Sequence, residues 1–134
     1  MLGALIEDDS LLHDVIAAGL QVEDFALSDH RRVFAAMLEL WQQQKPVDYV
    51  TVADALGNDQ EQYVLVGSLI QGVIVHPDHL LHHVEIIRNK ARLRALLRIA
   101  EWINSVVDDS SDADALIEEA VGRLERIARA EVTA

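Results

Sequence analysis

The sequence predicts an all-α fold in which a compact bundle of short helices is followed by an antiparallel helical hairpin. Apolar residues recur every three or four positions along most of the chain, which is the spacing of one helix face. Hydrophobic residues make up 51% of the 134 residues and aromatic residues only 4%, so we expect an aliphatic, helix-favouring core. A single domain, residues 1–134, is expected, with a globular helical part at 1–75 and the hairpin at 76–134.

The first part of the chain divides into short helices that begin and end at recognisable capping residues. Residues 1–6 read as the end of a short helix. Asp9 or Ser10 is predicted to cap the next helix, because both side chains accept hydrogen bonds from free backbone amides. Gly19 ends that helix, and Phe25 is expected to anchor a connecting turn.

A longer helix is predicted over residues 29–43. Ser28 precedes it as a favourable N-cap, and its apolar stripe includes Trp41, which we therefore expect in the core. Pro46 ends this helix, because a proline disfavours helical geometry in the residue before it.

Two further short helices complete the predicted bundle. Asp48 is expected to cap the first, which stops at Gly57-Asn58, and the second runs over residues 60–71. The β-branched run at 73–75 is read as a loop, because it lies close before a proline and has no partner strand.

The most informative segment is residues 79–107, which reads as one long helix with apolar side chains on more than one side. Pro77 lies near its start, where proline is tolerated. Ile99, Trp102 and Val106 lie largely outside the main apolar stripe. That stripe consists of Leu93, Leu96, Leu97, Ala100, Ile103 and Val107.

The last helix is predicted to follow an acidic turn at 108–112 and to run to about residue 130, with Ser111 and Asp114 approximating a capping box. Two long helices joined by a short turn form an antiparallel hairpin. Because one of them is apolar over most of its girth, we expect a second copy of the chain to cover it. The residues predicted to carry this self-association are Leu93, Leu96, Leu97, Trp102, Ile103, Leu116, Ala120 and Leu124.

Composition argues against several classes of function. No cysteine is present, so the chain has no disulfide, thiolate metal site or thiol nucleophile. The apolar start lacks a basic region ahead of it, and no apolar run approaches the ~18 residues of a membrane-spanning helix. We therefore expect a cytoplasmic protein that contacts no membrane. A net charge of −12 opposes free binding to nucleic acid.

Basic residues are nevertheless concentrated in the long helix. Five of the eleven lie there, at Arg88, Lys90, Arg92, Arg94 and Arg98. The first four are candidates for contact with DNA phosphates or with a partner protein. We favour salt bridges to acidic residues of the hairpin, including Glu85 and Glu101, because no aromatic residues interleave the run as stacking platforms.

Four histidines mark the start of the long helix, at His76, His79, His82 and His83. His79 and His83 have the i, i+4 spacing at which two imidazoles can hold one metal ion. The favoured interpretation is a polar helix start exposed to solvent or to a partner.

Acidic residues gather at the predicted caps and turns, at Asp8, Asp9, Asp14 and Asp108-Asp109. Acid–base catalysis by paired carboxylates requires burial, which such positions do not offer. We therefore predict no catalytic residue, no metal site and no cofactor in this chain.

Several short motifs occur in order along the sequence. They are Leu2-Gly3-Ala4-Leu5, Asp24-Phe25, His30-Arg31-Arg32-Val33-Phe34, Pro46-Val47-Asp48 with Thr51-Val52-Ala53, and Ile86-Ile87-Arg88-Asn89-Lys90-Ala91 with Arg94. Together, over essentially the whole chain, they resemble the N-terminal domain of DnaB-type replicative DNA helicases. The sequence departs from the family pattern at residues 60–64 and 76–83, where the bundle meets the hairpin.

The resemblance implies a non-catalytic oligomerisation and primase-binding domain that acts in DNA replication. In this family the hairpins of two subunits pack into a dimer, and three dimers form a collar on one side of a hexameric ring. The implied partners are a second copy of the chain, the C-terminal domain of primase and a helicase loader.

The ATPase motor of such helicases has no counterpart in this sequence. A P-loop holds nucleotide phosphates with a glycine-rich turn followed by a lysine, and neither Lys45 nor Lys90 follows a glycine. ATP and Mg²⁺ are therefore expected only in a motor domain that this chain lacks. The alternative interpretation is a free-standing DnaB-like regulator that binds the helicase ring or primase.

Overall fold

The structure, a computed structural model, describes residues 1–70 and 76–132. This part of the chain holds helices and no strand, which confirms the predicted all-α class. The loop expected at 73–75 lies outside the described residues. In chain order the elements are α1 (Leu2–Glu7), α2 (Ser10–Ala17), η1 (Val22–Asp24), α3 (Ser28–Gln42), α4 (Tyr49–Leu56), α5 (Gln60–Ile70), η2 (Pro77–His79), α6 (Leu80–Val106) and α7 (Ala113–Val132).

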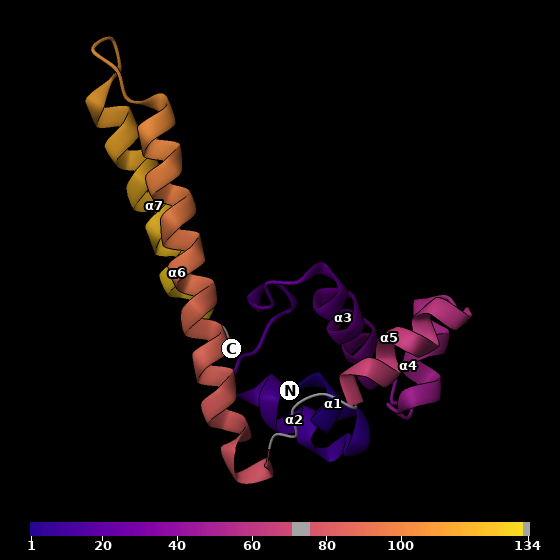
Figure 1. The fold of residues 1–134 in the computed structure, drawn as a ribbon. Coiled ribbons are helices and arrows are strands. Elements are labelled where there is room, and N and C mark those ends of the chain that lie inside the picture. Colours follow the sequence, from indigo (N-terminus) through magenta and orange to yellow (C-terminus); the bar gives the residue numbers. More distant parts are fainter. Residues whose placement is uncertain (71–75, 133–134) are drawn as a thin grey trace.

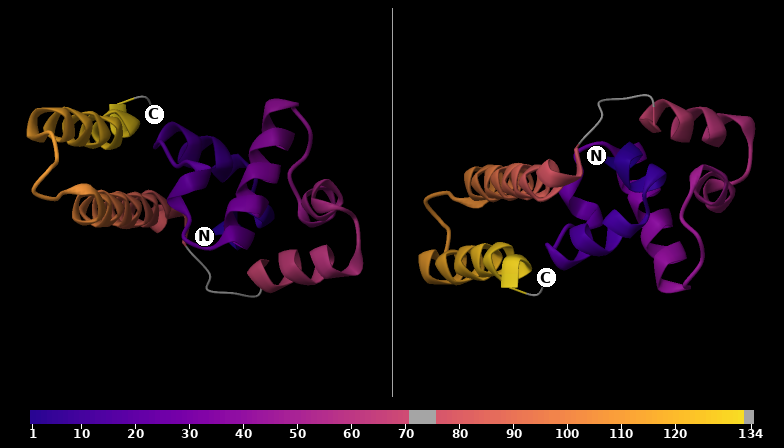
Figure 2. Two further views of the ribbon diagram at one scale, coloured as in Figure 1. Left: turned by 90° about the horizontal axis from the view of Figure 1, so that it is seen from above. Right: turned by 90° about the horizontal axis from the view of Figure 1, so that it is seen from below.

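The helices form two parts with different shapes. Helices α1 to α5 gather into a bundle, while α6 and α7 form an antiparallel hairpin whose tip extends well away from it (Figure 1). Seen along the hairpin, α6 and α7 lie side by side with the bundle to one side of them (Figure 2). α7 packs chiefly on α6, whereas the first half of α6 also packs on α2 and η1.

The core of the bundle is aliphatic with one aromatic centre. Phe34 of α3 is fully buried, and its ring centroid lies 5.2 Å from that of Phe25, which anchors the turn after η1 as predicted. Leu12 of α2 and Met37 of α3 are also fully buried in the same cluster. Because these side chains come from helices that are too short to be stable alone, their mutual burial holds the bundle together.

The base of α6 is bound to the bundle by apolar and polar contacts. Leu80 and Val84 belong to the bundle core. Arg88 Nη1 donates to the carbonyl oxygen of Ala18 at 3.0 Å, just after α2. Arg94 Nη2 donates to the carbonyl oxygen of Asp24 at 2.9 Å, at the end of η1. These two hydrogen bonds fix the direction in which the hairpin leaves the bundle.

Helix boundaries follow the sequence closely, but the capping groups often differ by one residue. Asp9 occupies the N-cap position of α2, yet the Asp8 carboxylate is the group that accepts from the Ser10 amide, at 3.1 Å. Leu27, not Ser28, is the N-cap of α3 and makes no capping bond. There the Arg31 side chain holds the preceding turn by donating to the carbonyl oxygens of residues 25 and 26, both at 2.8 Å.

The start of α7 also corrects a predicted cap. Asp112, not Ser111, lies just before the helix and accepts from the Ala115 amide at 3.3 Å. The Ser111 hydroxyl instead bonds within the turn, accepting from the Asp108 amide at 2.9 Å and donating to the Val106 carbonyl oxygen. The acidic turn itself is confirmed.

Trp41 is wrongly assigned to the core by its spacing. It lies in the last turn of α3 with 39% of its surface exposed, and its ring centroid is 6.4 Å from that of His13. The stripe that contains Phe34 and Met37 reaches the rim of the bundle at this turn, where α2 covers the Trp41 ring only in part.

The predicted cap at Asp48 is confirmed, and it offers a direct test of helix α4. The Asp48 carboxylate accepts from the Thr51 amide at 2.9 Å, and the Asp48 amide donates to the Thr51 hydroxyl at 2.8 Å. Replacing Asp48 with Ala is expected to lower the free energy of unfolding by about 1 kcal/mol, because the carboxylate that accepts from the Thr51 amide is lost. Urea unfolding measures this loss, and Asp54→Ala within α4 is the matched control. Equal losses for the two variants would contradict the capping role.

Candidate self-association surface

α6 changes its contact face along its length. Its first half turns Leu80 and Val84 into the bundle core. Its second half carries Ile99, only 9% exposed, together with half-buried Trp102 and Val106. These three residues share one side of α6 at helical spacing, and α7 is the helix that packs there. The minor apolar stripe of α6 therefore forms the seam inside the hairpin.

Trp102 is held in this seam by a cation from α7. The guanidinium carbon of Arg123 lies 3.9 Å from the centroid of the Trp102 ring. Arg123 Nε also donates to Glu119 Oε1 at 3.0 Å, which keeps the guanidinium in place. A guanidinium over an indole ring is attracted by the negative face of the ring.

Replacing Arg123 with Gln is expected to loosen the hairpin. We expect a loss of about 0.5–1 kcal/mol in the free energy of unfolding, since a partly exposed cation–π contact contributes that much. A double-mutant cycle with Trp102→Leu isolates the ring contact from the Glu119 pair. A coupling energy near zero would show that the contact stabilises nothing.

The main apolar stripe of the hairpin is left uncovered in the single chain. Leu97 of α6 is 62% exposed and Ile117 of α7 is 61% exposed, although both lie in helices. We call the large exposed apolar side chains of residues 93–124 the apolar hairpin face. Its residues are Leu93, Leu96, Leu97, Ile103, Val107, Ile117, Val121 and Leu124.

The contributions of the two helices lie on the same side of the hairpin. Successive residues turn by about 100°, so on each helix the exposed stripe is displaced by roughly 100–120° from the stripe that packs in the seam. The displacement has the same rotational sense on α6 and α7. Two antiparallel helices are related by a twofold axis perpendicular to the plane that contains them. Because this axis exchanges the helices without exchanging the two sides of that plane, stripes displaced equally on each helix lie on the same side of the hairpin. The apolar hairpin face is thus continuous across both helices.

The structure divides the self-association residues predicted from sequence into two groups. Five of them belong to the apolar hairpin face, namely Leu93, Leu96, Leu97, Ile103 and Leu124. Trp102, Leu116 and Ala120 are half-buried at seam positions within the protomer. Ile117 and Val121 were not in the predicted set, although their spacing on α7 places them one step around the helix from Leu116 and Ala120.

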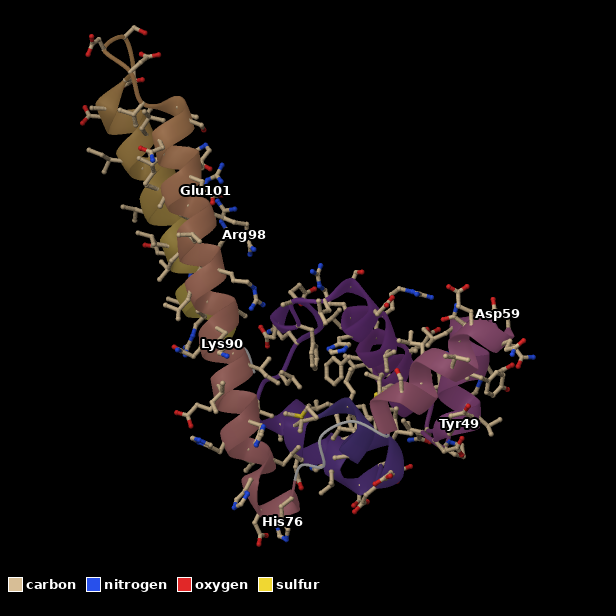
Figure 3. All side chains as sticks on the ribbon, viewed as in Figure 1. Tyr49, Asp59, His76, Lys90, Arg98 and Glu101 are labelled. Carbon is tan, nitrogen blue, oxygen red and sulfur yellow. The ribbon has the colours of Figure 1, made fainter. Side chains whose placement is uncertain are left out.

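The basic residues of α6 have mixed surroundings. Arg88 and Arg94 donate to backbone carbonyl oxygens of the bundle, which are contacts that the sequence did not predict. Figure 3 shows Arg98 and Glu101 on the side of α6 where the bundle lies. Lys90 is exposed at the base of the hairpin.

The histidines at the start of α6 form short-range contacts with one another and with acids. The ring centroids of His76 and His79 are 5.6 Å apart, and His76 Nδ1 lies 3.6 Å from a carboxylate oxygen of Asp78. His82 Nδ1 lies 4.0 Å from Glu85. Within residues 1–70 and 76–132, no group of three or more His, Asp or Glu side chains is placed to hold a metal ion.

Two of the acidic residues singled out from sequence, Asp8 and Asp108, accept hydrogen bonds within turns. The Asp108 carboxylate accepts from the Ser110 amide at 2.8 Å and from the hydroxyls of Ser110 and Ser111. These hydrogen bonds lower the pKa of Asp108 below its usual value. A carboxyl group with a lowered pKa suits a turn rather than proton transfer.

None of the described helices is long and apolar enough to cross a membrane.

Comparison with known proteins gives the same picture of the fold. The sequence model of a family described as DnaB-like helicase N terminal domain matches residues 1–89. Among 24 matching chains of solved structures is the N-terminal domain of DnaB helicase from Mycobacterium tuberculosis, with a TM-score of 0.78 and 22% sequence identity. That match covers 93% of this chain and 91% of the other. No curated protein matches the sequence significantly.

Proposed function

The chain belongs to the DnaB-like helicase N-terminal domain family, and we propose that it is the self-associating and partner-docking domain of a hexameric replicative DNA helicase. The observation that carries this proposal is the continuous apolar hairpin face, which the single chain leaves exposed to water. A domain of this kind has no catalytic role of its own, and we propose that it needs no cofactor.

The size of the apolar hairpin face supports a specific dimer. Its eight large side chains are 39–62% exposed and offer on the order of 600 Å² of apolar surface, near the ~800 Å² per partner of a standard interface. Covering it contributes about 25 cal/mol for each Å² removed from water. Because the face lies on one side of a stiff hairpin, two copies related by a twofold axis can cover each other's faces.

We further propose that the dimer is the unit from which a ring is assembled. In that arrangement three dimers form the collar of the hexamer, as the family resemblance implies. The bundle then lies outside the hairpin contact and is free to dock the C-terminal domain of primase and a helicase loader. The acidic character of the chain, with a net charge of −12, favours protein partners over DNA.

Sedimentation velocity tests both parts of the proposal. The chain alone is expected to sediment as a dimer at micromolar concentration and to dissociate on dilution. Adding a primase C-terminal fragment is expected to produce a larger complex. A chain that remains monomeric at every concentration would refute the self-association, and separate sedimentation of the two proteins would refute the primase docking.

A further inference from the structure

A second surface lies where the base of α6 crosses the bundle. It is a groove of ≈ 500 Å³ between the start of α1, the turn after η1, the start of α3, the end of α5 and the first half of α6. Leu27, Leu69 and Ile87 are among its apolar lining residues, above the buried ring of Phe25. Leu27 is 60% exposed there. The groove begins before the apolar hairpin face does, so a second copy on that face does not need to cover the groove.

The rim of the groove is cationic in a strongly acidic chain. Lys90 is exposed at the rim and makes no ion pair within the part of the chain that the structure describes. Arg94 is a second positively charged side chain in its lining. The whole chain has a net charge of −12, so the positive charge at the rim is opposite in sign to that of the chain as a whole.

The one acid among the described lining residues is compensated locally. The Asp24 carboxylate accepts from the Gln21 amide at 2.8 Å, and Arg94 donates to the Asp24 carbonyl oxygen at 2.9 Å. Burial raises the pKa of Asp24, while this hydrogen bond and the charges of Arg88 and Arg94 oppose the rise. Asp24 is therefore engaged with its own surroundings and does not cancel the exposed charge of Lys90.

We propose that this groove binds an acidic amphipathic peptide segment of a partner protein. An apolar side chain of the segment would rest on Leu27 and Ile87, and a neighbouring carboxylate would pair with Lys90. The apolar lining favours a peptide over a nucleic acid, and Phe25, the one ring of a Phe, Tyr or Trp in the lining, is buried and offers no platform for stacking bases. This inference rests on the partner-docking part of the proposed function but not on the hairpin dimer.

Fluorescence anisotropy with a designed probe tests the charge of the rim. The probe is a fluorescein-labelled peptide of about 15 residues with Leu and Phe at helical spacing and Glu elsewhere. It is expected to bind saturably, and the same peptide with Lys in place of Glu is not. Lys90→Glu is expected to weaken binding about tenfold. Lys45→Glu, which makes the same change in net charge outside the groove, is expected to leave binding unchanged.

A second pair of variants tests the apolar lining. Leu27→Ser is expected to weaken binding of the peptide probe about tenfold, because an apolar contact between the probe and Leu27 is removed. The fold should survive, since Leu27 is the N-cap of α3 and Ser is favoured at that position. Val64→Ser is the matched control, as Val64 is 64% exposed on α5 and does not line the groove.

Three results with the probes and the lysine variants would overturn the proposal. The first is no saturable binding of the acidic peptide. The second is equal weakening by Lys45→Glu and Lys90→Glu, which would indicate a non-specific charge effect. The third is Lys90-dependent binding of a single-stranded oligonucleotide in place of the peptide.

The hairpin variant Leu97→Glu separates this proposal from the dimer. Peptide binding to a monomeric Leu97→Glu chain would support the groove independently of self-association. Loss of peptide binding in that variant, with its helices intact, would place the peptide on the apolar hairpin face instead.

Discussion

Replacing Leu97 with Glu is expected to convert dimers of the chain into monomers. Leu97 is the most exposed side chain of the apolar hairpin face, at 62%. In a twofold dimer the substitution enters the interface twice, and each unpaired buried charge costs about 3–5 kcal/mol. The dimer dissociation constant should therefore rise by more than about 100-fold.

Sedimentation equilibrium measures this change, and circular dichroism shows whether the helices are retained. Because Leu97 lies outside the seam between α6 and α7, its substitution should leave the hairpin folded. Val64→Glu is the matched control, since Val64 is equally exposed on the bundle and the change in charge is the same. A Leu97→Glu chain that still forms dimers would refute the assignment of this face.

Replacing Phe34 with Ala is expected to produce the largest loss of stability among single substitutions in the bundle. Phe34 is fully buried, and its ring packs at 5.2 Å from that of Phe25. Removing a buried phenylalanine ring leaves a cavity that helices of the bundle cannot close, at a cost of about 3–5 kcal/mol. The free energy of unfolding of a typical domain is only about 5–15 kcal/mol, so a large share of the stability would be lost.

Urea unfolding measures this loss, with both proteins at the same concentration because self-association adds to apparent stability. Phe34→Leu is the control, because it keeps most of the apolar volume and should cost much less. A loss below about 1 kcal/mol for Phe34→Ala would mean that the bundle core does not depend on this ring.

Local sequence determined the helices because their signals are short-range. The i, i+3, i+4 spacing of aliphatic residues depends only on the pitch of the helix, so α3, α6 and α7 were predicted nearly to the residue. Caps were less certain, because neighbouring polar residues compete for the same amides. Asp48 had no competitor and was predicted correctly, whereas Asp112 took the role expected of Ser111.

The contacts of the basic residues show a second limit of local reasoning. Arg88 and Arg94 were expected to form salt bridges with acidic residues of the hairpin. In the structure each of them donates to a carbonyl oxygen 70 residues earlier in the chain. Such acceptors become available only when the end of α2 and η1 are packed against α6, so no local pattern points to them.

By itself, the sequence determined that this chain is helical, that a hairpin follows the bundle, and that the long helix is apolar on more sides than one neighbour can cover. Only the tertiary structure decided which side faces which neighbour. The minor stripe with Ile99 and Trp102 packs against α7, and the main stripe with Leu97 is exposed to solvent. Periodicity counts apolar faces on a helix, but the direction of each face is set by how the base of α6 is fixed to the bundle.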